Sequence, residues 1–102
     1  MSDTRLEGRA AVITGASDGI GLGIAQRYVQ AGGSVVLSDV DDARGEAATK
    51  ALKDAGAKVV YQHCDVTKKD DVLALVARSV KEFGAVDILV NNAYRGEGIR
   101  RV

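Results

Sequence analysis

A glycine-rich turn is the first feature of this sequence that could do chemistry. It runs Thr14-Gly-Ala-Ser-Asp-Gly-Ile-Gly21, with glycines at Gly15, Gly19 and Gly21. Glycines let a backbone turn sharply and approach a pyrophosphate, whose charge is stabilised by the N–H groups at the start of a following helix. The sequence contains no Gly-Lys pair, which excludes a Walker-type triphosphate loop, and Ile24 replaces the third glycine of the G-x-G-x-x-G form. An ordinary strand-to-helix turn is the alternative to a dinucleotide phosphate site.

Asp39 is the second such feature, because it follows directly on the apolar run Ser34–Ser38. A carboxylate at this place can accept hydrogen bonds from the adenosine ribose hydroxyls, whereas a 2′-phosphate would bring like charges together. Asp39 therefore favours NAD over NADP. Its alternative role is that of a turn acid in the loop Asp39–Asp42, in which Asp42 could cap the next helix.

Cys64 and His63 are the only cysteine and the only histidine of the chain. They allow neither an internal disulfide nor a metal site with two or more such ligands. A thiol nucleophile also needs a neighbouring base and an oxyanion site, and neither can be identified here. We therefore expect Cys64 to line a crevice without reacting.

Composition limits the partners and the size. The 102 residues carry a formal net charge of zero and are 46% hydrophobic, which is typical of one globular domain. Without basic runs, nucleic acid and anionic membrane are not expected as partners. The start, Met1–Arg9, has no apolar stretch, so we expect a cytoplasmic protein without a signal or a membrane span.

These residues need strands and helices to position them. Apolar runs predict strands over Ala10–Thr14, Ser34–Ser38, Val59–His63 and Val86–Val90. Helical spacing and end signals predict helices over about Gly19–Ala31, over Asp42–Ala55, and from a Thr67–Asp70 capping box to Phe83, which Gly84 caps. The fold class is thus α/β: a Rossmann-type parallel sheet of four strands in the order 3-2-1-4 with three helices, truncated after the fourth strand. We assign 1–94 to one dinucleotide-binding domain and 95–102 to an irregular C-terminal tail.

The spacing also predicts which side of each helix is buried. The expected apolar faces are Ile20, Ile24, Tyr28 and Ala31 in the first helix, Ala43, Ala47 and Ala51 in the second, and Val72, Val76, Val80 and Phe83 in the third.

At these motifs the chain resembles the short-chain dehydrogenase/reductase family over essentially its whole length. Thr14–Gly21 is similar to the family's coenzyme-binding turn, Asp39 to its acid after the second strand, Asp65-Val66 to its adenine-pocket pair, and Asn91-Asn92-Ala93 to the start of its N-N-A-G motif.

The resemblance implies roles for these residues. Asp65 would accept a hydrogen bond from the adenine amino group, although alone it could be an ordinary strand-end acid, and the Val66 backbone would meet the ring. Asn91 would steady the sheet, while Asn92 and Ala93 would lie along the cofactor ribose. The predicted cofactor-binding residues are Gly15, Ser17, Asp18, Gly19, Ile20, Gly21, Asp39, Cys64, Asp65, Val66, Asn91, Asn92 and Ala93.

Asp18 adds to the preference for NAD, because in this family a basic residue at its place often accompanies NADP. Arg44 lies near enough in sequence to act on a phosphate, but we expect it on a solvated helix face. Tyr94 stands where the family usually has glycine, and could stack on the cofactor, obstruct it, or be a partly exposed tail aromatic.

The family's catalytic signature, Tyr-x-x-x-Lys, has no match in this chain. Four residues beyond Tyr28, Tyr61 and Tyr94 stand Gly32, Asp65 and Gly98. We therefore expect no catalytic residue and an inactive chain.

Three interpretations remain open. The chain is the NAD-binding portion of an oxidoreductase that transfers hydride between NAD and an alcohol or carbonyl, a non-catalytic NAD-binding or regulatory module, or the product of a shortened reading frame. We also expect a homo-oligomer, formed through an exposed fourth strand or a thinly covered sheet face.

Overall fold

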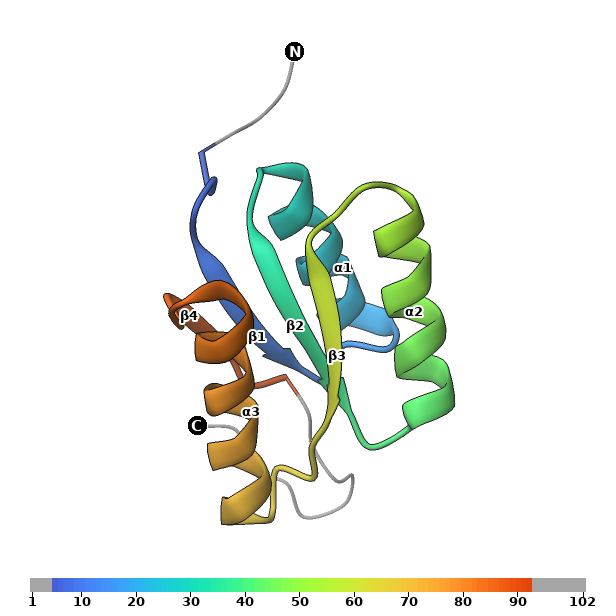
Figure 1. Cartoon of the computed structure of the whole chain (residues 1–102). Helices are drawn as coiled ribbons and strands as arrows, with labels where there is room; N and C mark the ends of the chain where they lie inside the picture. Colours follow the sequence, from blue (N-terminus) through green and yellow to red (C-terminus); the bar gives the residue numbers. More distant parts are fainter. Residues whose placement is uncertain (1–4, 93–102) are drawn as a thin grey trace.

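Strands and helices alternate strictly along the chain. The computed structural model describes residues 5–92, and within them the elements are β1 (Ala10–Thr14), α1 (Gly19–Gln30), β2 (Ser34–Asp39), α2 (Asp42–Asp54), β3 (Val59–His63), α3 (Lys69–Phe83) and β4 (Ile88–Val90). The described strands form one parallel sheet in the order β3-β2-β1-β4, which confirms the predicted fold class (Figure 1).

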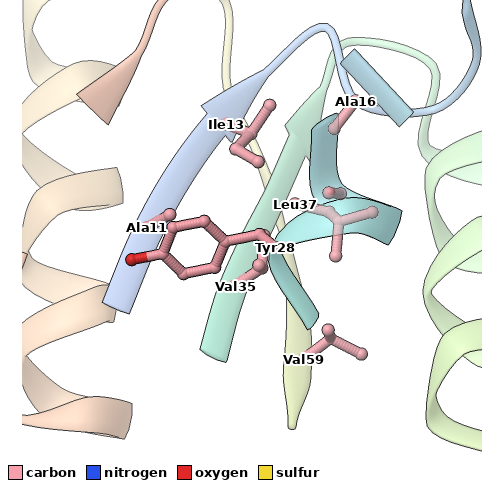
Figure 2. Packing of buried hydrophobic residues seen from close by; sticks show 8 residues of the cluster. Ala11, Ile13, Ala16, Tyr28, Val35, Leu37 and Val59 are labelled. Atoms are coloured by element: carbon pink, nitrogen blue, oxygen red, sulfur yellow. The ribbon is translucent and has the colours of Figure 1, made fainter. Parts of the chain in front are cut away.

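Helices cover both faces of this sheet. On one face, α1 and α2 close a core in which Tyr28 lies across β1 and β2 beside Ala11 and Val35 (Figures 1 and 2). On the other face, α3 brings Leu75 against Val12 and Val36. Successive strand residues thus point alternately into two cores, as in a parallel sheet buried on both sides.

The fourth strand is shorter than expected. It covers Ile88–Val90 instead of Val86–Val90, because the backbone and carboxylate of Asp87 are bonded to Ala10 at the point where β1 begins. Val86 instead packs against the core under α3. Ile88 and Leu89 are 40% and 52% exposed at the edge of the sheet. The predicted bare edge is therefore present among the described residues, and self-association stays a prediction.

The predicted apolar face of α1 is wrong at its first position. Ile20 is 75% exposed, whereas Gly21, Ala25 and Tyr28 are buried. The helix turns Gly21 inward because its first turn lies against the carbonyl of Gly15, which leaves no room for a side chain.

The predicted face of α2 is also wrong. Ala43, Ala47 and Ala51 are exposed, and the buried positions are Gly45 and Thr49. The Tyr61 ring of β3 fills the space beside Gly45, where a Cβ would come within 2.1 Å of Tyr61 Cε1. The packing of this large ring decides which side of α2 faces the sheet, because the small alanine side chains would bury much less apolar area.

The predicted face of α3 is confirmed in part, since Val72 and Phe83 pack against the core. Its fully buried residues, however, are Leu75 and Ser79, and Val80 is 50% exposed. The expected capping box does not form. The residue before the helix is Lys68, with no side-chain cap, and the Thr67 hydroxyl instead donates to Asp65 Oδ1 at 2.6 Å. Gly84 ends the helix in the left-handed conformation, as predicted.

Within residues 5–92, no helix combines the length and the apolar character that crossing a membrane requires.

Candidate functional site

A cleft of about 390 Å³ lies at the carboxyl ends of the parallel strands. Its position follows from the topology, because ligands of open α/β sheets bind where these ends meet and the strand order reverses. The residues that line it are Gly15, Asp18, Gly19, Ile20, Asp39, Val40, Cys64, Asp65, Val66 and Asn92. All of these except Val40 are among the residues singled out from the sequence.

The glycine turn forms one wall of the cleft. Gly15 and Gly19 both have φ of 62°, a conformation that L side chains rarely adopt. Gly21 is needed for a different reason, because a Cβ there would lie 2.2 Å from the Gly15 oxygen and 2.8 Å from Asn92 Nδ2. The turn therefore brings the start of α1, whose first N–H groups have no acceptor within the helix, to the cleft.

Asp39 ends β2 and is held by four hydrogen bonds. Its Oδ2 accepts from the Ser17 N–H at 3.2 Å and from the Ser17 hydroxyl at 2.6 Å. Its Oδ1 accepts from the N–H groups of Val40 and Asp41 at 2.8 Å and 3.2 Å. Burial raises the pKa of this carboxyl, but the hydrogen bonds from Ser17, Asp41 and Val40 outweigh burial, and the pKa is lowered. Asp39 is thus a fixed carboxylate at the cleft.

Ser17 and Asp18 lie on the turn but differ in surroundings. Ser17 is buried and supports Asp39 from beneath the cleft. Asp18 lines the cleft and is exposed; its Oδ2 lies 2.5 Å from Arg44 Nη1. Arg44 is therefore not simply a solvated face residue of α2.

Asp65 lies at the turn that follows β3. Its N–H donates to Asp71 Oδ2 at 3.0 Å, and its Oδ1 accepts from Thr67, so it does serve the local turn while lining the cleft. Val66 lines the cleft beside it. Cys64 is buried, and burial raises the pKa of its thiol, which disfavours the nucleophilic thiolate.

The asparagine pair follows β4. The Asn92 N–H donates to the Thr14 hydroxyl at 2.9 Å, and its side-chain amide donates to the Gly15 oxygen at 3.2 Å. Asn91 Oδ1 lies 3.2 Å from Thr14 Oγ1, outside the cleft lining. These contacts tie the end of β4 to the glycine turn. Ala93 and Tyr94, like the predicted tail, lie outside the described residues.

Sequence reasoning missed two contributors. Val40 lines the cleft and is 54% exposed; an apolar residue directly after Asp39 was the available signal. Tyr61 supports the same loop, with its hydroxyl 2.8 Å from the Asp39 carbonyl oxygen and 2.7 Å from Asp42 Oδ1. That support depends on a long-range contact, and no local pattern indicates it.

A family model described as short chain dehydrogenase matches residues 9–99. The chain belongs to this family. Within the part of it that the structure describes, no group of three or more His, Cys, Asp or Glu side chains could hold a metal ion.

The chain is also similar to individual members of the short chain dehydrogenase family, in sequence and in structure. The chain is 43% identical over 97 residues to tropinone reductase-like 1 of Erythroxylum coca, with 93% of this chain and 35% of that protein covered. A hydroxysteroid dehydrogenase structure from Escherichia coli superimposes with a TM-score of 0.86 at 38% identity, covering 92% of this chain and 40% of that one. A short chain dehydrogenase/reductase from Burkholderia phymatum, solved in complex with NAD, gives 0.80 at 35% identity, covering 87% and 31%.

The chain thus spans about 35% of the length of the plant relative, and it corresponds to the N-terminal part of oxidoreductases of this family.

Proposed function

We propose that this chain binds NAD(H) in preference to NADP(H), as the cofactor-binding portion of an oxidoreductase that acts on an alcohol or a carbonyl. The Asp39 carboxylate, fixed by four hydrogen bonds at the cleft, is the observation that carries the preference. The NAD complex of the Burkholderia phymatum relative supports the choice of cofactor class.

The residues present fit a dinucleotide. The pyrophosphate would lie against Gly19 and Ile20 at the start of α1, where Gly21 lets the helix approach the turn. The ribose hydroxyls would donate to Asp39. Because its carboxylate already accepts four hydrogen bonds, about as many as it has acceptor sites, a ribose hydroxyl would replace one of the present donors. Asp65 and Val66 would border the adenine, and Asn92 with Ala93 the other ribose.

Bound NAD supplies a hydride acceptor, and NADH a hydride donor. The chain's own residues bind and orient the cofactor. No Tyr-x-x-x-Lys occurs among the 102 residues, so the proton-transferring tyrosine that the family resemblance implies has no counterpart here. The cytoplasm stays the predicted compartment.

Titration of the purified chain with NAD, NADH and NADP by calorimetry tests the proposal. We expect the chain to bind NAD more tightly than NADP. In Asp39→Ala the difference between these two affinities should be smaller. Asp54→Ala is the matched control, since it removes an exposed acid of α2 whose partner is Lys50. Equal affinities for NAD and NADP in the unmodified chain would contradict the ribose assignment.

A further inference from the structure

Arg44 is the one cation that the structure brings to a residue of the cleft lining within residues 5–92. It lies in the first turn of α2, with Nη1 2.5 Å from Asp18 Oδ2 and Nε 3.7 Å from Asp41 Oδ2. Its backbone N–H is fixed as well, donating to Asp41 Oδ1 at 3.1 Å. Among the described residues that line the cleft itself, there is no lysine and no arginine.

Asp18 is used in an unusual way. It occupies the N-cap position of α1, where an aspartate normally accepts a hydrogen bond from an N–H of the first turn, yet its side chain makes no such bond. The carboxylate is directed across to Arg44 instead. Asp18 therefore connects the glycine turn to the start of α2, and it lines the same cleft as Asp39 and Val40.

A guanidinium at this place could bind a phosphate group on the ribose of a bound nucleotide. Arginine binds phosphate dianions through paired N–H donors, and an arginine near the ribose end of such a cleft is what accommodates a 2′-phosphate. Here two carboxylates, from Asp18 and Asp41, already surround that guanidinium and offset its charge.

We propose that Asp18 sequesters Arg44 and so makes the cleft reject a 2′-phosphorylated adenosine. The inference rests on the proposed NAD function and adds a second determinant to it. Asp39 opposes the 2′-phosphate directly, whereas Asp18 acts by occupying the cation that could bind this phosphate. Asp18 is thus a specificity-determining residue and Arg44 the cation that it occupies, and neither takes part in the chemistry.

The pair can be broken without loss of the fold. Both side chains are more than half exposed, at 57% for Arg44 and 64% for Asp18, and exposed ion pairs contribute little to stability. Asparagine is also a favourable N-cap residue. Asp18→Asn therefore removes the charge while keeping the shape of the turn.

The test uses AMP and adenosine 2′,5′-bisphosphate as probes, because these two nucleotides differ only in the 2′-phosphate. Their affinities are measured by calorimetry for the unmodified chain, Asp18→Asn, Arg44→Gln, the double variant, and the control Asp54→Asn, which frees Lys50 at the far end of α2. We expect Asp18→Asn to raise the affinity for the bisphosphate relative to AMP about five- to tenfold, through a charge-assisted contact to the released guanidinium. Arg44→Gln alone and Asp54→Asn should leave the ratio unchanged, and the double variant should lose the gain.

Two outcomes would overturn this inference and leave the proposed function intact. If the double variant keeps the full gain, Asp18 acts by direct repulsion. If Arg44→Gln alone weakens bisphosphate binding as much as Asp18→Asn strengthens it, Arg44 is not sequestered. If the unmodified chain binds neither probe, the proposed function fails and the inference fails with it. This result differs from the two above, in which the unmodified chain still binds the probes.

Discussion

The two strands that flank β1 differ sharply in burial. In β2, Val35, Val36, Leu37 and Ser38 are fully buried, because α1 and α2 cover one face, α3 covers the other, and strands lie on both sides. In β4, Ile88 and Leu89 are 40% and 52% exposed, at the edge of the sheet.

This difference continues into the site. Asp39 leaves the end of the buried strand and is held by four hydrogen bonds, whereas Asn91 and Asn92 leave the exposed strand and are held mainly through Thr14 and Gly15. The Asp39 side of the cleft is thus anchored in the core. The asparagine side depends on its contact with the glycine turn.

Removing side-chain volume from the two strands gives the largest expected contrast. Leu37→Ala should lower the free energy of unfolding by about 2–5 kcal/mol, since it leaves a cavity in a packed core. Leu89→Ala deletes the same atoms at a half-exposed position and should cost about 0.5 kcal/mol. Urea unfolding followed by circular dichroism measures both. Similar losses for the two variants would mean that β4 is covered in solution, for instance by a second copy of the chain.

Breaking the contact between the two sides of the cleft should have the next largest effect. Gly21→Ala would press a methyl group against the Gly15 oxygen and Asn92 Nδ2, so it should cost about 1–3 kcal/mol and abolish NAD binding. Gly23→Ala is the matched control in the same helix, with open space at its Cβ, and should stabilise by up to about 1 kcal/mol. Unfolding curves and calorimetric titration of both variants decide the point. Unchanged NAD affinity in Gly21→Ala would show that the turn does not hold the pyrophosphate.

Gly19 requires glycine for another reason. A Cβ there meets nothing within 4 Å, so crowding is no obstacle, and the constraint is its φ of 62°. A β-branched substitution at Gly19 would strain the turn itself, which makes Gly21 the cleaner probe of contact.

The sequence allowed the strand ends and their polar residues to be predicted, because both signals are local. Apolar runs marked the strands, and Asp39, Asp65 and the glycine turn follow them directly. In a parallel sheet these ends meet, so the cleft could be located without a structure.

The buried helix faces could not be predicted in this way. The spacing of Ala43, Ala47 and Ala51 was as regular as that of a buried face, yet small residues provide little apolar area to fix the helix orientation. The Tyr61 ring decides that orientation from another strand, and Gly45 accepts it. Likewise, the Asp18–Arg44 pair joins residues 26 positions apart, which local spacing cannot reveal.

The smallest expected effect concerns Asp39, at the end of β2, and the dependence of its hydrogen bonds on pH. The pKa of Asp39 is lowered because the hydrogen bonds from Ser17, Asp41 and Val40 outweigh the effect of burial. A carboxyl with a lowered pKa in the folded state stabilises the fold above its unfolded pKa, and this contribution is lost as the pH falls through the folded pKa. Ser17→Ala deletes the 2.6 Å bond and should cost about 1 kcal/mol or less at pH 7, since Asp39 is partly solvated.

That cost should shrink as the pH falls through the folded-state pKa of Asp39, which lies below the ordinary aspartate value of 3.8, because a protonated carboxyl no longer offers the Ser17 hydroxyl a charged acceptor. Urea unfolding of the unmodified chain and Ser17→Ala at a series of pH values measures the difference. In an Asp39→Asn background the same Ser17→Ala change should have a cost that does not vary with pH. If Ser17→Ala costs as much in acid as at pH 7, Ser17 stabilises the turn by packing. The hydrogen bond from its hydroxyl to the charged Asp39 carboxylate would then contribute nothing measurable.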